Sequence, residues 1–280
     1  MKKLLTICFI LIHTWSLASN NDQAPWYIVQ ISDPQLGFIE KNKSIEQETI
    51  LLKKAIQKIN SLQPEILVIT GDFVNSSHNI EQIKKFKELC HLISHEILLY
   101  KVPGNHDIGN SCNKENVDFY NAQYGEDHFS ILHKGVQLIG INSCLIKDDA
   151  PQQKHQLQWL HKELKQKCKI EQRIIFGHHP FFLSNISEKE SYSNMPIKIR
   201  TIYNALFLKY HVSHYFAGHL HNNATAENNG IKYITTSALG KQLGNARSGI
   251  RIIQIKNKKI SHLYVCLLYT SPSPRDSTSS

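Results

Sequence analysis

Residues 66–72 read Ile-Leu-Val-Ile-Thr-Gly-Asp, an apolar run that ends in a glycine and an aspartate. A short apolar run without alternation is typical of a strand that is covered on both faces of a sheet. Pro64 ends the helical segment before it, so the strand begins near Ile66. The sequence therefore predicts that Asp72 stands directly beyond the end of a buried strand.

Four other polar motifs follow predicted strands in the same way. They are Asp33-Pro34-Gln35 after residues 26–31, Gly104-Asn105-His106-Asp107 after residues 97–100, Gly177-His178-His179 after residues 173–176, and Gly218-His219-Leu220-His221 after residues 214–217. In an α/β sheet, the loops beyond the carboxyl ends of the strands gather at one edge. Carboxylate, amide and imidazole groups at such an edge indicate a site for two metal ions. Such a pair polarises a phosphoryl oxygen and activates water, so the pattern is typical of a phosphoester hydrolase.

The segments around these strands complete the predicted fold. Helices are expected over residues 44–62, 80–92, 117–124, 152–167 and 199–210. A hairpin is expected over residues 128–132 and 136–141, and further strands over residues 224–227, 231–235, 250–255 and 260–265. Alternating strands and helices followed by hairpins predict an α/β fold with two mixed β-sheets packed face to face. With helices outside, this is a four-layer α/β/β/α sandwich.

The amino-terminal end is expected to lie outside this domain, which we place at residues 26–265. Residues 1–18 have a basic start, an apolar stretch and small residues before a cleavage position, so we expect a signal peptide. The stretch is short for a bilayer span, and no other segment is long and apolar enough to be one. We therefore expect an exported protein, periplasmic or secreted, without a membrane span in the mature chain.

The carboxyl-terminal end, residues 266–280, is also expected to lie outside the fold. Its sequence Cys-Leu-Leu-Tyr-Thr-Ser-Pro-Ser-Pro-Arg-Asp resembles the translation of a sequencing adapter, which would make it non-native. The alternative is a genuine Ser/Pro-rich tail without a fixed structure. Either interpretation leaves the predicted domain unchanged.

Charge and cysteine spacing argue against several other kinds of protein. The formal charge of +9 falls to +7 when Lys2 and Lys3 leave with the signal peptide, and the basic residues are scattered among acids. We therefore expect no binding of duplex nucleic acid, although the charge would attract anionic phosphoesters. No Gly-rich phosphate loop and no Gly-x-Ser-x-Gly turn occurs, so neither a P-loop NTPase nor a covalent serine hydrolase is supported. Four cysteines without Cys-x-x-Cys spacing are expected to pack in the core, with one disulfide allowed by export: Cys90, Cys112, Cys144 and Cys168.

Over residues 31–221, the motif series resembles the calcineurin-like metallophosphoesterase superfamily. The Asp33-Pro34-Gln35 start is similar to a branch of this superfamily that acts on phosphoserine and phosphothreonine. The resemblance implies a metallophosphoesterase-like fold and two divalent metal ions (Mn, Fe, Zn or Mg). It implies that Asp72 bridges the two ions, since a carboxylate has two oxygens. It also implies the remaining ligands, which are Asp33 and His221 on the first ion and Asn105, His178 and His219 on the second.

Other side chains are implied to act on the substrate. His106 would lie near the scissile bond as general acid for the leaving oxygen or as a stabiliser of phosphoryl charge. Asp107 is expected to orient His106, and His179 is expected near the substrate while its neighbour His178 binds metal. The loop of residues 183–196, with Tyr192, is expected to line the cleft.

Gln35 departs from the commonest superfamily pattern, which has a histidine at this position. A glutamine carbonyl is a harder and weaker ligand than imidazole, so the first site is expected to favour Mn²⁺ or Mg²⁺. Gln35 either binds the ion or donates a hydrogen bond to its water. Asn75 is either a further oxygen ligand or a turn residue. Purple acid phosphatases have a tyrosine at the position of Asn75, so the resemblance does not extend to that branch.

Three functions are compatible with these residues. We favour direct hydrolysis of a phosphomonoester by a hydroxide activated by the two metals, carried out by a monomer on a phosphorylated small molecule or phosphoprotein. The first alternative is a phosphodiesterase, for example one acting on a cyclic nucleotide. The second is a non-catalytic binding protein that keeps the fold, against which the complete ligand set argues.

Overall fold

The computed structural model describes residues 24–109, 111–166 and 169–267. The expected signal peptide, Cys168 and residues 268–280 of the expected tail lie outside the described residues. In the part that is described, no helix combines the length and the apolar character needed to cross a membrane. The last strand runs to Cys266, one residue beyond the expected domain boundary.

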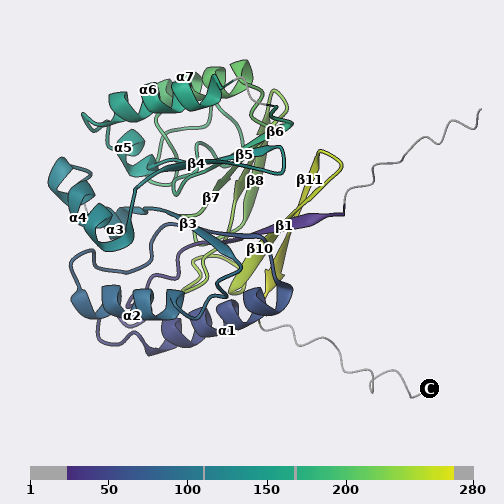
Figure 1. The fold of residues 1–280 in the computed structure, drawn as a ribbon. Coiled ribbons are helices and arrows are strands. Elements are labelled where there is room, and N and C mark those ends of the chain that lie inside the picture. Colours follow the sequence, from purple (N-terminus) through teal and green to yellow (C-terminus); the bar gives the residue numbers. More distant parts are fainter. Residues whose placement is uncertain (1–23, 110, 167–168, 268–280) are drawn as a thin grey trace, which may run out of the picture.

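Two mixed β-sheets form the centre of the molecule (Figure 1). The five-stranded sheet has the order β11-β10-β1-β2-β3, in which β1, β2 and β3 are parallel. Its strands are β1 (Trp26–Ile31), β2 (Ile66–Thr70), β3 (Leu98–Val102), β10 (Gly249–Lys256) and β11 (Lys259–Cys266). The six-stranded sheet has the order β4-β5-β6-β7-β9-β8, with β5, β6, β7 and β9 parallel. Its strands are β4 (Phe129–His133), β5 (Val136–Gly140), β6 (Gln172–Phe176), β7 (His214–Ala217), β8 (Ala224–Asn228) and β9 (Ile231–Thr235).

Helices cover the outer face of each sheet. Figure 1 shows α1 and α2 against the five-stranded sheet, and α6 and α7 against the six-stranded sheet on the opposite side. The four-layer α/β/β/α sandwich predicted from the sequence is therefore confirmed. These helices are α1 (Glu46–Leu62), α2 (Ile80–Cys90), α6 (Gln153–Leu164) and α7 (Ile197–Lys209). Shorter helices are α3 (Asn105–Ile108), α4 (Lys114–Tyr124) and α5 (Ser143–Lys147).

The burial of β2 explains why its sequence does not alternate. Leu67 and Ile69 pack into the apolar layer under α1 and α2. Ile66 and Val68 point the other way, into the apolar layer between the two sheets. Since successive side chains of a strand point to opposite faces, a strand covered on both faces must be apolar throughout.

Two short helices were not expected from the sequence. α3 and α5 have four and five residues, too few to show a helical period. In α5 the Asn142 side chain accepts hydrogen bonds from the N–H groups of Cys144 and Leu145. α4 begins at Lys114 rather than at residue 117, because Asn113 caps it by accepting from the N–H of Asn116.

The four cysteines in the described part of the chain are free thiols, namely Cys90, Cys112, Cys144 and Cys266. Cys112 and Cys144 are buried and belong to the apolar layer under α1 and α2. Burial raises the pKa of the Cys112 thiol to about 12, since an apolar environment disfavours the thiolate. The expectation that cysteines pack in the core is confirmed for these two.

Gln30 in β1 is a polar connection between the two sheets. Its amide nitrogen donates to the Thr70 hydroxyl at 2.9 Å and to the Ala217 carbonyl at 3.0 Å, across to β7 of the other sheet. Its carbonyl accepts from the Thr236 hydroxyl at 2.6 Å. Gln30 is fully buried, so these bonds align the two sheets three residues before Asp33.

We expect Gln30→Leu to lower the free energy of unfolding by about 2–4 kcal/mol, because it leaves buried partners of the amide without a hydrogen bond. Urea unfolding would measure the change. Gln47→Leu, at an exposed position of α1, is the matched control and should shift the value by less than about 0.5 kcal/mol. Equal stability of the two variants would show that the polar connection contributes nothing.

Candidate metal centre

The predicted motifs meet at one edge of the two sheets, where they are joined by main-chain hydrogen bonds. The N–H of Asp33 donates to the Gly71 carbonyl at 3.1 Å, and that of Gln35 donates to the Asp72 carbonyl at 2.8 Å. The N–H of Gly218 donates to the His178 carbonyl at 2.9 Å. The loops after β1 and β2, and those after β6 and β7, are therefore held together by their own backbones.

The backbone at these motifs is held in an unfavourable conformation. A positive φ costs free energy for a residue with a side chain, and such strain is concentrated at functional sites. Five of the predicted ligands have one, namely Asp33 (52°), Gln35 (41°), Asp72 (51°), His219 (68°) and His221 (53°).

Two glycines are required by close approach to the carboxylates. A Cβ on Gly104 would collide with the Asp72 carboxylate, and one on Gly218 would collide with the Ser32 hydroxyl and the Asp33 carboxylate. These motifs therefore begin with glycine because the backbone passes directly over the ligand side chains.

His178 lies at the centre of one ligand group. Its Nε2 is 3.1 Å from Asn105 Oδ1, 3.2 Å from His219 Nδ1 and 3.4 Å from Asp72 Oδ2. Atoms that share an ion at about 2.1 Å lie about 3.0–3.4 Å apart, so this spacing fits one metal ion. Nδ1 of His178 donates to the Thr70 carbonyl at 2.9 Å, which turns Nε2 toward the other ligands.

Asp33 and His221 form the other ligand group, which is predicted to bind the first ion. Nδ1 of His221 donates to the Lys241 carbonyl at 2.5 Å, so a neutral His221 presents a lone pair at Nε2. This Nε2 lies 3.3 Å from Asp33 Oδ1. Two acceptors at this distance are stable only with a cation, either a proton or a metal ion, beside them.

Buried acceptors without hydrogen bonds confirm that a cation fits this group. Oδ1 of Asp33 and Oε1 of Gln35 are buried, and neither has a hydrogen-bond donor within the described residues. The other Asp33 oxygen is satisfied by the Ser32 hydroxyl at 2.5 Å and the His219 N–H at 3.0 Å. Of the two Asp33 oxygens, the one without a donor among the described residues is therefore the one beside His221.

The pKa values of the metal-free protein follow from this crowding of acceptors. Burial disfavours protonation of His178, but the Asp72 carboxylate outweighs it and raises the pKa of the imidazole to about 9. Burial together with His178 lowers the pKa of His219 to about 4. The metal-free site therefore carries a proton on His178 at neutral pH, while His219 stays neutral.

His106 lies beside the ligands and is oriented by backbone. Its N–H donates to Asp72 Oδ1 at 2.8 Å, and its ring Nδ1 donates to the Asn75 carbonyl at 2.9 Å. Nε2 is then the ring atom left for proton transfer.

The expected role of Asp107 in orienting His106 is not what the structure shows. The carboxylate of Asp107 accepts from the N–H groups of Phe73 at 2.7 Å and Gly104 at 2.9 Å. The reason is the position of Asp107 in the first turn of α3, which directs its carboxylate to the start of that helix. Asp107 joins two ligand loops, and the Asn75 carbonyl orients the imidazole.

The remaining predicted residues surround the ligands. The Gln35 amide nitrogen lies 3.4 Å from Asn75 Oδ1, which leaves its own carbonyl oxygen toward the site. The Asn75 amide donates to Asn42 at 2.8 Å, so Asn75 supports Gln35 and His106, and its further role as an oxygen ligand stays a prediction. His179 is buried with its ring 4.4 Å from that of His219, and its contact with substrate stays a prediction.

Two aromatic side chains border the ligands. Tyr192 lies where the sequence predicts it, with its carbonyl 3.4 Å from His219 Nε2. Phe38 was missed, although its ring centroid is 5.3 Å from that of His221. No motif marks Phe38, and only its place three residues after Gln35 could have indicated it.

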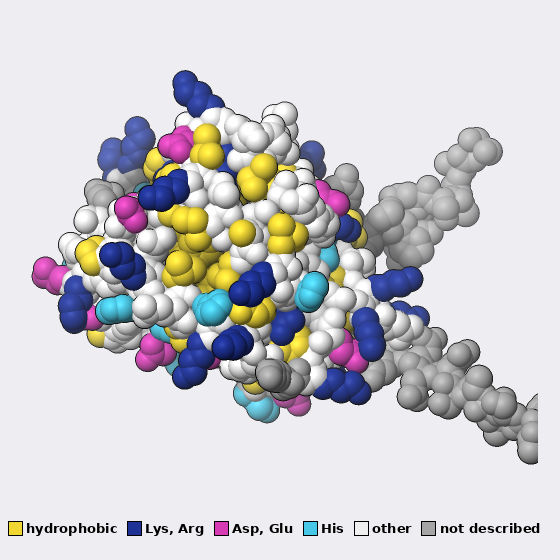
Figure 2. Space-filling view, turned by 90° about the horizontal axis from the view of Figure 1, so that it is seen from above, with side chains coloured by type: hydrophobic (Ala, Val, Ile, Leu, Met, Phe, Trp, Pro, Cys, Tyr) yellow, Lys and Arg dark blue, Asp and Glu magenta, His cyan; other side chains and the backbone are white. Residues whose placement is uncertain are grey.

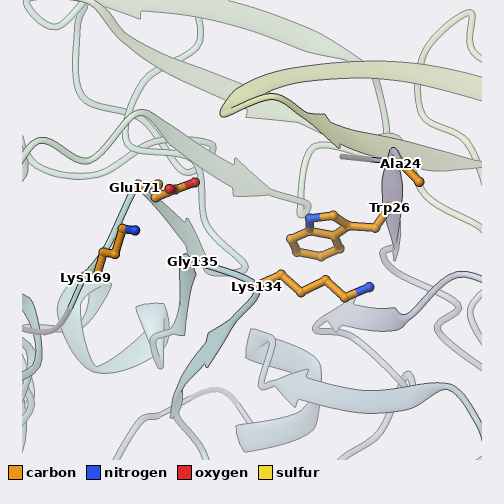
Figure 3. A pocket seen from close by; sticks show the side chains of 6 residues that line it. All are labelled: Ala24, Trp26, Lys134, Gly135, Lys169 and Glu171. Carbon is orange, nitrogen blue, oxygen red and sulfur yellow. The ribbon is translucent and has the colours of Figure 1, made fainter. Parts of the chain in front are cut away.

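Two hollows elsewhere contain none of these residues. One of about 570 Å³ is lined by Trp26, Lys134 and Glu171, among others, at the amino-terminal ends of the strands (Figure 3). The other, of about 430 Å³, lies between α6 and α7 beside Leu157 and Ile202. Figure 2 shows apolar side chains gathered on this face among lysines and histidines. The predicted ligands instead lie at the carboxyl-terminal ends of the strands, opposite the first hollow.

A family model for calcineurin-like phosphoesterases matches residues 27–223. The chain belongs to the calcineurin-like phosphoesterase family. It is 31% identical over 261 residues to the serine/threonine-protein phosphatase CPPED1 of Danio rerio. The aligned region covers 86% of this chain and 84% of that protein.

Solved structures share the fold of this calcineurin-like phosphoesterase. A dimetal phosphatase from Danio rerio has a TM-score of 0.63 at 13% identity, covering 86% of this chain and 99% of its own. The purple acid phosphatase PPD1 from yellow lupin has a TM-score of 0.66 at 15% identity, covering 88% and 52%. The family match and the ligand geometry together identify the chain as a metal-dependent phosphoester hydrolase with two divalent metal ions as cofactors.

Metal binding at pH 7 should release between one and two protons, because His178 and, in part, His221 must lose a proton to become ligands. Since the pKa of His178 is raised to about 9, metal affinity should increase with pH up to that value. Calorimetry in two buffers of different ionisation enthalpy measures the proton count. His155→Asn, at an exposed position in α6, is the control and should release the same number. An enthalpy that is independent of the buffer would contradict the protonated state of His178.

Proposed function

We propose that this enzyme hydrolyses phosphomonoesters by direct attack of water, without a phosphorylated enzyme. The observation that carries the proposal is the adjacency of the two ligand groups. Ligand atoms of Asp33, Asp72 and His178 all lie within 4.8 Å of one another. This is the arrangement expected for two ions about 3.5–4 Å apart that act on one phosphoryl group.

Each ligand has a defined place in this proposal. When bound, the two ions draw charge from the phosphoryl oxygens and activate the attacking water. Asp72 would contact both ions. The remaining ligands are Asp33, Gln35 and His221 for the first ion and Asn105, His178 and His219 for the second.

His106 is proposed to supply the proton for the leaving oxygen. The bond from Nδ1 to the Asn75 carbonyl fixes the ring and leaves Nε2 as the nitrogen that exchanges a proton with the substrate. A proton carried on Nε2 can pass to the ester oxygen as the P–O bond breaks, so an alkoxide is never released. The bond between the His106 N–H and Asp72 ties this donor to the metal ligands.

Four finer points are proposed, three from the sequence and one from the relatives. The amide oxygen of Gln35 favours Mn²⁺ or Mg²⁺ at the first ion, because these ions prefer oxygen ligands. The basic and apolar pattern of residues 1–18 supports export. The expectation of a monomer remains a proposal. The monoester preference is supported by the name of the CPPED1 relatives, which are serine/threonine-protein phosphatases.

With Mn²⁺ added, kcat/KM for p-nitrophenyl phosphate should exceed that for bis(p-nitrophenyl) phosphate by about tenfold or more, since a dianionic phosphoryl group gains most from two cations. A spectrophotometric assay gives both values, and chelation of the metal should abolish both activities. Faster turnover of the diester would reverse the assignment in favour of a phosphodiesterase. Metal binding without turnover of either ester would favour a binding protein.

His106→Gln should lower kcat for a monoester by about 100-fold to 1,000-fold, because the leaving oxygen loses its proton donor. Metal content, measured by elemental analysis, should stay at the wild-type value, since His106 is not a proposed ligand. His155→Gln provides the control for loss of an exposed imidazole. Full activity of His106→Gln would remove His106 from the mechanism.

A further inference from the structure

We propose that Phe38 and Tyr192 form an aromatic cleft beside the metal centre that selects phosphomonoesters with an aromatic group on the ester oxygen. The inference rests on the proposed monoesterase function and names the substrate class of that same site. It depends on three observations, which are the contacts of the two rings, the exposure of Tyr192 and the way its loop is held.

The two rings contact different metal-ligand imidazoles. The Phe38 centroid is 5.3 Å from that of His221 and 6.3 Å from that of His106. The Tyr192 centroid is 4.7 Å from that of His219. His221 and His219 belong to different ligand groups, so one ring lies beside each group. An ester group held between the two ligand groups would therefore lie next to both rings.

Tyr192 is held in place although it is largely exposed. Tyr192 is 69% exposed, slightly more than other exposed apolar residues such as Leu263 and Ile80. Its hydroxyl lies 3.4 Å from the amide nitrogen of Asn105, and its carbonyl 3.4 Å from Nε2 of His219. An exposed aromatic surface that is fixed at a functional site is typical of a ligand-binding surface.

Lys147 fixes the backbone on both sides of Tyr192. Its ammonium group donates to the Ser191 carbonyl at 2.7 Å and to the Asn194 carbonyl at 2.5 Å. The lysine reaches these atoms from α5, which belongs to the same edge of the six-stranded sheet. Two of its donors are thus used to hold the loop.

Glu188 and Arg200 order the rest of this loop. The Glu188 carboxylate accepts from the N–H of Leu183 at 2.9 Å and from the Asn194 amide at 2.7 Å. Partial burial opposes ionisation, but these hydrogen bonds lower the pKa of Glu188 to about 2. The buried Arg200 donates to the carbonyls of Met195 and Glu188. Because the loop is ordered before binding, stacking on Tyr192 does not have to overcome the entropy of ordering it.

The chemistry of the two walls suits an aromatic ester with a doubly negative phosphate. Aromatic groups gain from offset or edge contacts with other rings, by an amount that corresponds to about threefold to tenfold in affinity. Lys241 places its ammonium group 5.4 Å from the Phe38 centroid, so a positive charge also borders this wall. A small alkyl ester would contact the metal centre but would leave the rings uncovered.

The test compares 2-naphthyl phosphate with phenyl phosphate, whose leaving groups have similar acidity but different apolar area. We expect wild-type kcat/KM to be about fivefold to tenfold higher for the naphthyl ester. Tyr192→Ser should reduce this ratio to less than about twofold, whereas Tyr192→Phe should keep it because the ring remains. Leu263→Ser, which removes an equally exposed apolar side chain from β11, should leave both values unchanged.

A binding measurement makes the result independent of turnover. Calorimetry with the Mn²⁺-loaded protein should show that Tyr192→Ser weakens 1-naphthylphosphonate about tenfold but leaves methylphosphonate within about twofold. Equal losses for both ligands, or a naphthyl preference that survives in Tyr192→Ser, would overturn the aromatic cleft and leave the monoesterase proposal intact. If no monoester is hydrolysed, the monoesterase proposal fails, and the phosphonate comparison still decides the cleft.

The same assay identifies the source of the aromatic ester. Free phosphotyrosine and a phosphotyrosine peptide carry the same leaving group. A higher kcat/KM for the peptide would support a protein substrate in the cleft, and equal values would support a small molecule. A preference for a phosphoserine peptide over the phosphotyrosine peptide would contradict aromatic selection.

Discussion

Asp33 and Asp72 bring two carboxylates into one buried space, and much of the structure around them responds to that charge. A buried carboxylate is strongly unfavourable unless cations or hydrogen-bond donors surround it. Asp72 accepts a hydrogen bond from the His106 N–H, whereas Asp33 Oδ1 has no donor among the described residues. The raised pKa of His178 is a consequence of the same charge, since a proton then occupies the position expected for a metal ion.

Main-chain carbonyls orient the imidazole rings of the site by accepting hydrogen bonds from them. Thr70, Asn75 and Lys241 each accept a hydrogen bond from one ring nitrogen, so the other nitrogen of His178, His106 or His221 is left for function. A carbonyl at the end of a strand or in a tight loop moves less than a side chain would. The positive φ values of the ligand residues show the cost of bringing these loops so close together. The free energy for that strain comes from the three apolar layers, in which strands such as β2 are buried on both faces.

The parts that could be predicted from the sequence are those encoded by side-chain type. The strands were recognised because burial on both faces makes them apolar throughout, and the ligands because they follow these strands directly. The role of Asp107 could not be predicted, since a carboxylate beside a histidine in sequence may equally turn toward backbone, as it does here. The group that orients His106 is the main-chain carbonyl of Asn75. Every residue has such a carbonyl, so the sequence does not indicate which one accepts this hydrogen bond. The short helices α3 and α5 are too short to show a helical repeat of apolar residues. They begin where side chains accept hydrogen bonds from main-chain N–H groups, which the sequence alone did not indicate.

Metal binding and substrate contact are assigned to different kinds of structure in this enzyme. The proposed ligands follow directly from strand ends, and their loops are joined by backbone hydrogen bonds, so a change there disturbs several of them at once. The loop of residues 183–196 instead has its own hydrogen bonds, through Lys147, Glu188 and Arg200, and contacts the centre mainly through Tyr192. A change in that loop can alter what lies beside the phosphoryl group without moving a ligand. This separation gives a physical reason why chains of one family can keep the same metal ligands while their substrates diverge.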